Sequence, residues 1–238
     1  MNIVDHIQRQ LFWYGYYEKS LSSIWEKLIN KNDTIIDIGA NIGYFSILAA
    51  NKATLGKTYC FEPISFHFSQ LQKNISLNGL TNIYPYPQAI SDKTENTVIF
   101  ISNPDNSGMS SLSMPENFSG KSEKTATITI DKFISDHQIL NVNLIKIDVE
   151  GAELKVIQGM LETLNKCKPL VIIEVIEKYL NRFNNTSPEL FNLLYDYGYN
   201  SYEIKDFSTL QQINEPIDSY AILFAPENYC FPDTIQLR

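Results

Sequence analysis

A short glycine-containing turn is the first part of this 238-residue sequence whose residue types suggest binding chemistry. The segment 37–43, DIGANIG, ends a β-rich run and opens a helical pattern of apolar residues. Gly39 permits a tight turn and a close approach of a ligand, and Gly43 lets the helix pack against its strand. The amides at the helix N-terminus then face a polar ligand. Asn41 stands in the region of the middle glycine of a dinucleotide motif, which weakens the interpretation as a pyrophosphate site.

Acidic residues stand at the ends of the predicted strands. Glu62 follows Gly43 by 19 residues and ends the next predicted strand, where a carboxylate accepts hydrogen bonds from the ribose hydroxyls of nucleoside cofactors. In an open α/β sheet, ligands lie beyond the carboxyl ends of the strands. We therefore expect one cleft to collect five acids: Asp37, Glu62, Asp148, Glu150 and Glu174.

These acids require compensation. Carboxylates gathered in a cleft repel one another, so we expect some to be protonated, paired or bound to cationic groups of a ligand. Strand alternation puts Lys146 on the same side as Asp148 and Glu150, where it would neutralise an acid. Asp148, Glu150 and Glu174 also offer oxygen atoms to a hard cation such as Mg²⁺, whereas no Cys/His spacing suggests zinc. We expect no bound metal.

The elements that position these residues alternate along the chain. Strands are predicted at 34–40, 58–63, 83–90, 144–149, 169–175, 199–204 and 219–225. Helices are predicted at 42–53, 65–78, 152–164 and 188–199. This alternation predicts a parallel sheet with helices on both faces. About 14 residues without a helical pattern separate the last two strands, which favours a terminal antiparallel pair.

Two further segments frame this pattern. Residues 3–30 are predicted to be a helical lead-in, and we assign 1–31 to an N-terminal extension or lid and 32–238 to a single α/β domain. Within the domain, predicted strands at 98–101 and 125–130 flank a long polar loop, an insertion over 103–122. Long loops are usually functional or disordered, so we expect this loop to shape a pocket and to be mobile without ligand.

Composition excludes several classes of function. The net charge is −8 and basic residues are scattered singly, which argues against nucleic-acid binding and against an anionic membrane surface. No apolar run reaches membrane-spanning length, and the first 20 residues lack a signal-peptide core. The three cysteines are far apart, so a reducing cytoplasm is expected. The oligomeric state is left open.

Aromatic residues and histidines give weaker signals. The cluster Phe12, Trp13, Tyr14, Tyr16 and Tyr17 is interpreted either as core packing or as a lid over a ligand, and we favour the lid. The three histidines are isolated, and none lies at a predicted strand end. We expect each to be a surface or helix residue: His6, His67 and His137.

Several ordered motifs together resemble one family. DIGANIGYFS, CFEP, QAISD, SGMSSL, TITID and KIDVEGAE look like the FkbM family of class I methyltransferases over about residues 14–177. The replacement of the middle glycine by Asn41 is part of the family pattern, and residues 15–18, GYYE, resemble the segment that precedes its fold.

The resemblance implies a Rossmann-like three-layer sandwich with a seven-stranded, mostly parallel sheet whose last pair is reversed. It also implies binding of S-adenosyl-L-methionine and methylation of a hydroxyl on a sugar, glycan, glycolipid or secondary metabolite. The implied cofactor residues are Asp37, Gly39, Asn41 and Gly43 at the methionine end, Glu62 at the ribose, Gln88 and Ala89 beside the adenine, and Ala40 within the turn. The resemblance also implies that Asp148, Glu150 and Gly151 border the methyl-transfer site. A neutral hydroxyl needs a base, so we expect Asp148 or Glu150 to be the catalytic residue that accepts its proton. The alternative is that these acids only bind the acceptor or the ammonium group of the cofactor. We assign the acceptor side to Tyr17, Glu18, Ser110, Lys146 and Glu174.

Three functions from different classes remain open on the sequence alone. An O-methyltransferase acting on a sugar, a glycan or a polyketide-type small molecule fits the incomplete glycine motif and the acidic strand ends. A nicotinamide-dependent oxidoreductase shares the first strand–helix–strand unit but normally has a fuller glycine motif. A cofactor-binding module without catalysis is the third alternative.

Overall fold

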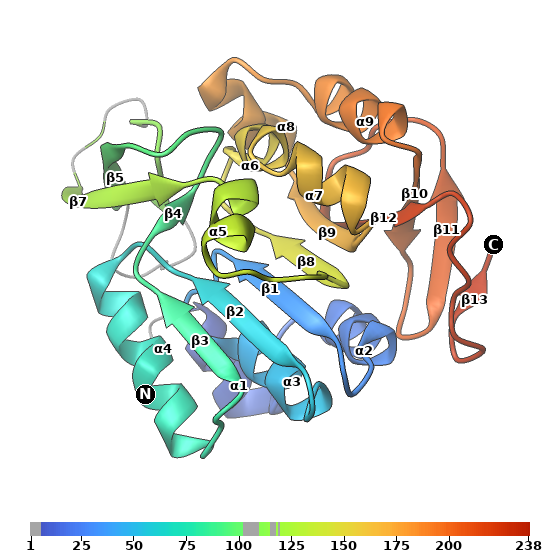
Figure 1. Cartoon of the computed structure of the whole chain (residues 1–238), viewed down its shortest axis with the longest axis horizontal. Helices are drawn as coiled ribbons and strands as arrows, with labels where there is room; N and C mark the ends of the chain where they lie inside the picture. Colours follow the sequence, from blue (N-terminus) through green and yellow to red (C-terminus); the bar gives the residue numbers. More distant parts are fainter. Residues whose placement is uncertain (1–5, 102–109, 115–117, 119) are drawn as a thin grey trace.

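A large mixed sheet forms the centre of the protein (Figure 1). The computed structural model describes residues 6–101, 110–114, 118 and 120–238. Within these residues the main sheet has nine strands in the order β13-β11-β10-β12-β9-β8-β1-β2-β3. The strands are β1 (Thr34–Ile38), β2 (Lys57–Phe61), β3 (Ile83–Tyr86), β8 (Leu144–Ile147), β9 (Leu170–Val175), β10 (Tyr199–Ile204), β11 (Thr209–Ile213), β12 (Ser219–Pro226) and β13 (Gln236–Leu237).

The predicted number of strands in the main sheet, seven, is therefore too low. The seven predicted strands form an unbroken block from β10 to β3, and β11 and β13 extend it at one edge. β1 pairs in parallel with both β2 and β8, whereas β12 is antiparallel to both β9 and β10. The mostly parallel block and the antiparallel terminal pair are thus confirmed.

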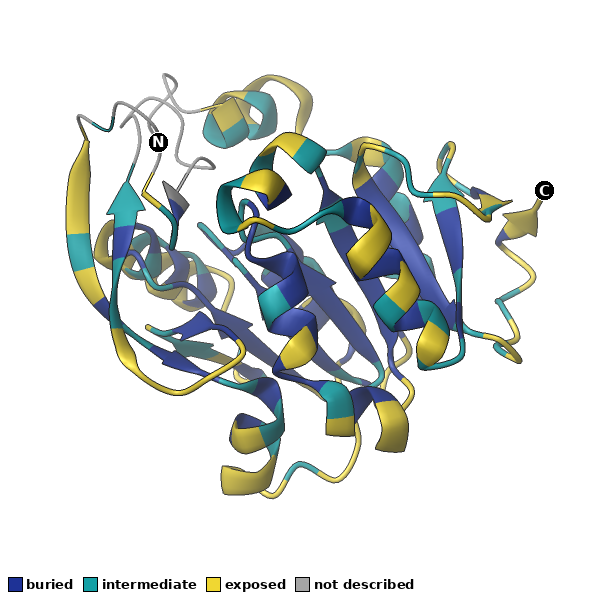
Figure 2. Ribbon diagram, turned by 90° about the horizontal axis from the view of Figure 1, so that it is seen from above, coloured by how far each residue is buried: buried dark blue, intermediate teal, exposed yellow. Residues whose placement is uncertain are grey.

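Strand alternation builds a separate core on each face of the sheet. Along β1, Ile36 and Ile38 belong to one core and Ile35 to the other. The first core packs against α5 (Ile130–Asp136), α6 (Glu153–Gln158), α7 (Leu161–Lys166) and α9 (Ser187–Asp196). The second packs against α2 (Lys19–Leu28) and α3 (Tyr44–Lys52). Figure 2 shows the buried strands between the two layers of helices.

A smaller second sheet fills the region predicted as an insertion. Its described strands are β4 (Ala89–Ile90), β7 (Lys121–Ile128), β5 (Asn96–Ile101) and β6 (Ser110–Ser111), in that order. The interpretation of 103–122 as a plain loop is wrong at two places, because β6 and the start of β7 lie inside it. Residues 102–109, 115–117 and 119 lie outside the described residues, so the prediction of loop mobility stays a prediction.

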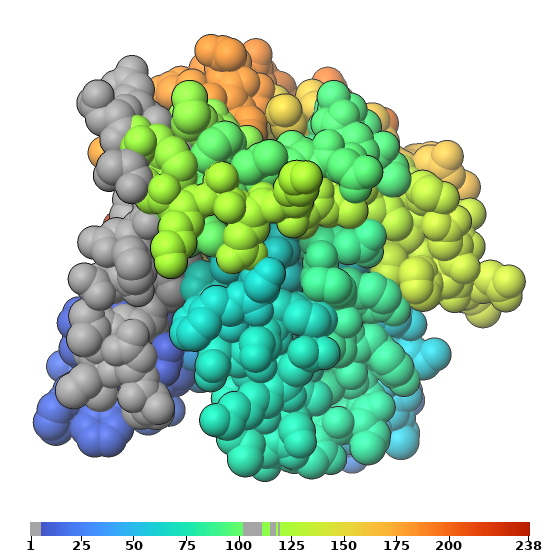
Figure 3. Space-filling view, turned by 90° about the vertical axis from the view of Figure 1, so that its left-hand side faces the viewer, coloured from blue at the N-terminus to red at the C-terminus, as the bar shows by residue number. Residues whose placement is uncertain are grey.

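The second sheet lies against α4 (Ser65–Leu77), and Figure 3 shows their surfaces side by side. Glu123 of β7 accepts hydrogen bonds from the backbone amide and the hydroxyl of Ser65, at 3.0 and 2.8 Å. The carboxylate therefore caps the N-terminus of α4, where a negative charge is favourable. The predicted strand 83–90 divides between the two sheets, as β3 and β4.

Two predicted helices are interrupted. The helix expected at 152–164 is divided at Gly159 and Met160 into α6 and α7. A Cβ atom on Gly159 would lie 2.2 Å from the carbonyl oxygen of Ser91, so only glycine fits at this break. The N-terminal lead-in becomes α1 (His6–Tyr14) and α2, separated at Gly15 and at Glu18, which has a left-handed φ of 43°. A four-residue helix α8 (Glu177–Leu180) and a 3-10 turn η1 (Asn181–Phe183) follow β9. Among the described residues, no helix is long and apolar enough to cross a membrane.

Candidate active site

A cleft lies beyond the carboxyl ends of β1, β2, β8 and β9, where the sequence predicted a ligand. It brings together twelve of the fifteen predicted site residues: Tyr17, Asp37, Gly39, Ala40, Asn41, Glu62, Gln88, Ala89, Lys146, Asp148, Glu150 and Glu174. Gly43 and Glu18 lie next to lining residues but do not line the cleft themselves. Ser110 lies on β6, and its side chain is outside the described part of the structure.

The glycine turn has the backbone geometry that its sequence predicts, for reasons that only the fold reveals. Gly39 and Gly43 have φ angles of 82° and 91°, and Asn41 has 50°. A Cβ atom on Gly39 would lie 1.8 Å from the carbonyl oxygen of Asp148, so this position is closed by a neighbouring strand end. A Cβ atom at position 43 would lie 2.4 Å from the Leu71 side chain of α4. Gly43 therefore allows α4, rather than the preceding strand, to pack closely against the turn.

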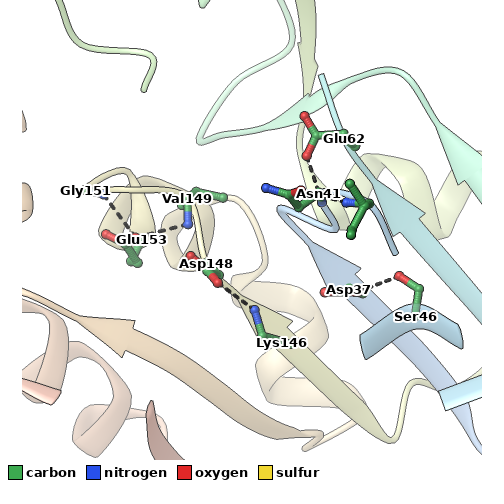
Figure 4. Close-up of polar contacts among 10 residues, drawn as sticks. Asp37, Asn41, Ser46, Glu62, Lys146, Asp148, Val149, Gly151 and Glu153 are labelled. Atoms are coloured by element: carbon green, nitrogen blue, oxygen red, sulfur yellow. Dashed lines mark hydrogen bonds and ion pairs between the residues drawn. The ribbon is translucent and has the colours of Figure 1, made fainter. Parts of the chain in front are cut away.

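Glu62 joins the second strand to the turn. One carboxylate oxygen accepts a hydrogen bond from the amide of Asn41 at 2.9 Å (Figure 4). The other accepts from the amide of Ile64, also at 2.9 Å. The side chain is almost fully buried but lines the cleft. A carboxylate oxygen has two lone pairs, so each oxygen keeps capacity to accept a ligand hydroxyl.

Asp37 is a buried acid with one unsatisfied oxygen. Its Oδ2 accepts a 2.5 Å hydrogen bond from the hydroxyl of Ser46 on α3 (Figure 4). Its Oδ1 has no partner among the described residues, although the residue is only 1% exposed. Burial raises the pKa of Asp37 above its ordinary value, against the opposing effect of Lys146. A buried acceptor without a donor is a favourable position for a cationic or N–H group of a ligand.

Lys146 supplies a positive charge beneath these acids. Its Nζ donates a 2.8 Å hydrogen bond to Oδ2 of Asp148 (Figure 4). The same atom lies 4.9 Å from the centre of the Phe45 ring. Burial opposes the charge on Lys146, but Asp148, Asp37 and Glu18 outweigh it and raise the pKa of the lysine. The predicted neutralising pair is thus present in the structure.

Three carboxylates face one another at the end of the cleft. Asp148, Glu150 and Glu174 each offer a carboxylate oxygen within 4.8 Å of the others. Carboxylate oxygens are the ligands that hard cations such as Mg²⁺ prefer. Burial, followed by the charge of Asp148, raises the pKa of Glu150 to about 8 and that of Glu174 to about 10. One oxygen of Glu150 and one of Glu174 is buried and lacks a described partner. The side chain of Asp148 is 36% exposed and remains open to the cleft.

Glu153, which the sequence analysis did not single out, holds the loop that carries Asp148 and Glu150. Its Oε1 accepts hydrogen bonds from the amides of Val149 and Gly151, at 3.2 and 3.1 Å (Figure 4). Glu150 and Gly151 have left-handed φ angles of 57° and 111°, so the loop depends on this support. Burial raises the pKa of Glu153 to about 7. The sequence signal was an acid in the first turn of a helix directly after the motif.

The N-terminal helices close one side of the cleft. Tyr17 lines it and packs edge-on against Tyr44 and Phe45 of α3. Burial raises the pKa of Tyr17, and the neighbouring Glu18 raises it further. Ile7 of α1 lines the cleft as well. Phe12, Trp13 and Tyr14 are exposed and are not among the residues that line the cleft. Core packing is therefore wrong for these three, and their role as a lid stays a prediction.

The segment after β6 reaches across to the same loop. The hydroxyl of Ser111 donates to the carbonyl of Glu150 at 3.2 Å, and that of Ser113 donates to the carbonyl of Arg182 at 2.9 Å. Leu112, between them, lines the cleft. The second sheet thus contributes one wall of the site.

His67 also lines the cleft. It lies on α4, so the expectation of a surface or helix residue is met by the helix, although the side chain is only 5% exposed. No strand-end signal marked it, because its placement depends on how α4 packs.

The comparisons with known proteins place the chain in a family of methyltransferases. Residues 37–201 match the methyltransferase FkbM domain, so the chain belongs to this family. A solved methyltransferase FkbM from Methylobacillus flagellatus is 16% identical, with a TM-score of 0.54, over 84% of this chain and 47% of that one. This likeness supports the α/β methyltransferase fold.

Two curated relatives match at similar levels. Hexuronic acid methyltransferase AglP from Haloferax volcanii is 27% identical over 145 residues, which cover 61% of this chain and 56% of the relative. Methyltransferase 1 from Beauveria bassiana is 27% identical over 143 residues, which cover 53% of this chain and 57% of the relative. The chain spans little more than half the length of these two relatives.

Proposed function

We propose that this protein is an S-adenosyl-L-methionine-dependent O-methyltransferase acting on a hydroxyl of a sugar, glycan or glycolipid. One observation carries the proposal: a single cleft is lined both by the glycine turn with Glu62 and by the acids Asp148 and Glu150. Membership of the methyltransferase FkbM family supports the reaction class, and the hexuronic acid methyltransferase relative supports a sugar acceptor.

The residues of the turn fit the proposed cofactor. The unsatisfied Oδ1 of Asp37 offers an acceptor for an ammonium group, and the amides of the turn lie at the N-terminus of α3. Glu62 has lone pairs left for ribose hydroxyls, and Gln88 and Ala89 line the side assigned to adenine. When bound, the cofactor would supply an activated methyl group on a sulfonium. The excess of acids over Lys146 favours a ligand with positive groups.

The acceptor side is assigned to the acids at the other end of the cleft. A neutral hydroxyl is a poor nucleophile, so a nearby carboxylate that accepts its proton typically contributes 10²–10⁴-fold. Asp148 is open to the cleft and is held by Lys146, whereas Glu150 has a pKa of about 8 and a buried, unpartnered oxygen. We assign the base to Glu150 and acceptor orientation to Asp148 and Glu174.

Calorimetry with S-adenosylhomocysteine, NAD and NADP tests the cofactor. We expect binding of S-adenosylhomocysteine alone, and binding of a nicotinamide nucleotide alone would replace the proposal by an oxidoreductase. Transfer of labelled methyl groups to a panel of glycans, glycolipids and polyketides then tests the acceptor. Labelling of polyketides alone would retain the reaction class and reject the sugar, whereas cofactor binding without transfer to any acceptor would favour a binding module.

A further inference from the structure

A buried histidine beside Glu62 has a nitrogen that no described residue satisfies. The Nδ1 atom of His67 lies 3.8 Å from Oε1 of Glu62, which is too far for a hydrogen bond. No other described residue pairs with this nitrogen, although only 5% of the residue is exposed. Leaving a buried polar atom unpaired is unfavourable, so such an atom requires an explanation.

The position of His67 beside the cleft suggests an explanation for its unpaired nitrogen. His67 lies in the first turn of α4, and Pro63 and Ile64 line the cleft between it and Glu62 in the sequence. Glu123 of β7 caps this turn, and Ile64 donates its amide to Glu62, so the backbone around the two side chains is fixed. Both side chains line the cleft, so the gap between Nδ1 and Oε1 lies in its wall.

A single hydroxyl fits the chemistry of this gap. Two atoms 3.8 Å apart can both lie about 2.8 Å from one oxygen, which is an ordinary hydrogen-bond length. A hydroxyl donates one proton and accepts others, so it can donate to the Glu62 carboxylate while it accepts from Nδ1 of His67. No charge on the histidine is needed for this arrangement.

We propose that His67 is a second ribose-binding residue, which together with Glu62 holds one ribose hydroxyl of the cofactor and selects a ribonucleoside over its deoxy form. The inference rests on the proposed function, because it takes the nucleoside from there. His67 positions the cofactor and takes no part in proton transfer at the acceptor.

Calorimetric titration with S-adenosylhomocysteine and with its 2′-deoxy and 3′-deoxy derivatives tests the proposal. We expect His67→Leu to weaken binding of S-adenosylhomocysteine about 3- to 10-fold, the usual effect of one neutral hydrogen bond. The same substitution should change the affinity for one of the two deoxy derivatives less than about twofold, because that ligand has already lost the contact. Equal losses for all three ligands, or no loss, would overturn the proposal.

Matched variants separate the hydrogen bond from packing. His67→Asn keeps a polar atom near the position of Nδ1 and should retain most of the affinity, whereas His67→Gln places its amide near Nε2 and should behave as His67→Leu. Gln72→Leu, a substitution at an exposed position further along the same helix, should bind as the wild type does. Equal binding by the Asn and Gln variants would count against the contact. A wild-type protein that binds no S-adenosylhomocysteine would instead overturn the proposed function.

Discussion

Lys146 and Asp148 form a 2.8 Å ion pair in which the lysine is buried and the aspartate faces the cleft. The lysine is therefore fixed by its surroundings, and the aspartate is fixed by the lysine. Asp37 and Glu18 also act on the charge of Lys146, so one cation compensates acids from the N-terminal segment, β1 and β8.

Lys146→Met should lower the free energy of unfolding by about 2–3 kcal/mol near pH 8, because removal of one partner leaves desolvated carboxylates uncompensated. The deficit should shrink towards pH 5, where those acids can take up protons. Urea unfolding at both pH values measures the effect. Lys132→Met is the matched control: it breaks an exposed pair with Asp136 and should cost less than about 0.5 kcal/mol. Equal losses for the two variants would contradict the compensating role.

Glu150 should set the pH dependence of methyl transfer. A general base must be deprotonated, so kcat/KM should rise with pH and level off above about 8, the pKa of Glu150. Glu150→Gln should lower kcat about 10²–10⁴-fold. In Asp148→Asn the rising limb should move to lower pH, since the charge of Asp148 raises the pKa of Glu150. A limb that stays in place in Asp148→Asn, or an unchanged kcat in Glu150→Gln, would reject the assignment.

Glu153 should prove necessary for the loop rather than for the chemistry. Glu153→Leu removes the acceptor of two amide hydrogen bonds and should lower the free energy of unfolding by about 2–4 kcal/mol. It should also lower kcat more than it raises the dissociation constant of S-adenosylhomocysteine. Glu153→Gln keeps an acceptor oxygen and should recover most of both properties. Failure of the glutamine variant to recover them would mean that the charge, and not the hydrogen bonds, matters.

The ligand-free protein should become less stable as the pH rises from about 5 to 9. The pKa values of Glu153 and Glu174, about 7 and about 10 in the folded protein, lie above the ordinary value of 4.5. The folded state therefore binds more protons than the unfolded state above pH 4.5, and its stability falls through this range. Urea midpoints at pH 5.5 and 8.5 measure the loss, which Glu174→Gln should reduce. A midpoint that rises with pH would contradict these shifts.

Glu62→Ala should weaken S-adenosylhomocysteine binding about 10- to 100-fold, because hydrogen bonds to a charged group are strong. Part of this effect should come from the turn, since the same carboxylate holds the amide of Asn41. Glu62→Gln keeps an acceptor oxygen and should fall between the alanine variant and the wild type. Thermal unfolding identifies folded variants, and an unchanged affinity in a folded Glu62→Ala would reject the ribose assignment.

The residues that the sequence identified are those whose position follows from topology. Parallel strands end at one edge, so Asp37, Glu62 and Asp148 could be brought together without knowledge of side-chain packing. Glu153 and His67 were missed because their roles arise from a local loop conformation and from the packing of α4. Neither property leaves a periodic signal in the sequence.

The sheet edge was missed for a related reason. β11 buries its first two residues and exposes the next two, so it lacks the alternation by which strands are recognised. β13 has two residues, both exposed. Such an edge is defined by its hydrogen bonds to β10 and β11 and not by its side chains.

The contact between Gly39 and the carbonyl of Asp148 limits how this protein can be re-engineered. Any side chain at position 39 would have to displace the backbone of Asp148, directly after β8, so we predict that it would disturb the proposed cofactor and acceptor sites together. Libraries aimed at new acceptors should therefore leave position 39 constant. They should instead vary Leu112, which lines the cleft from a surface segment held by the hydroxyls of Ser111 and Ser113.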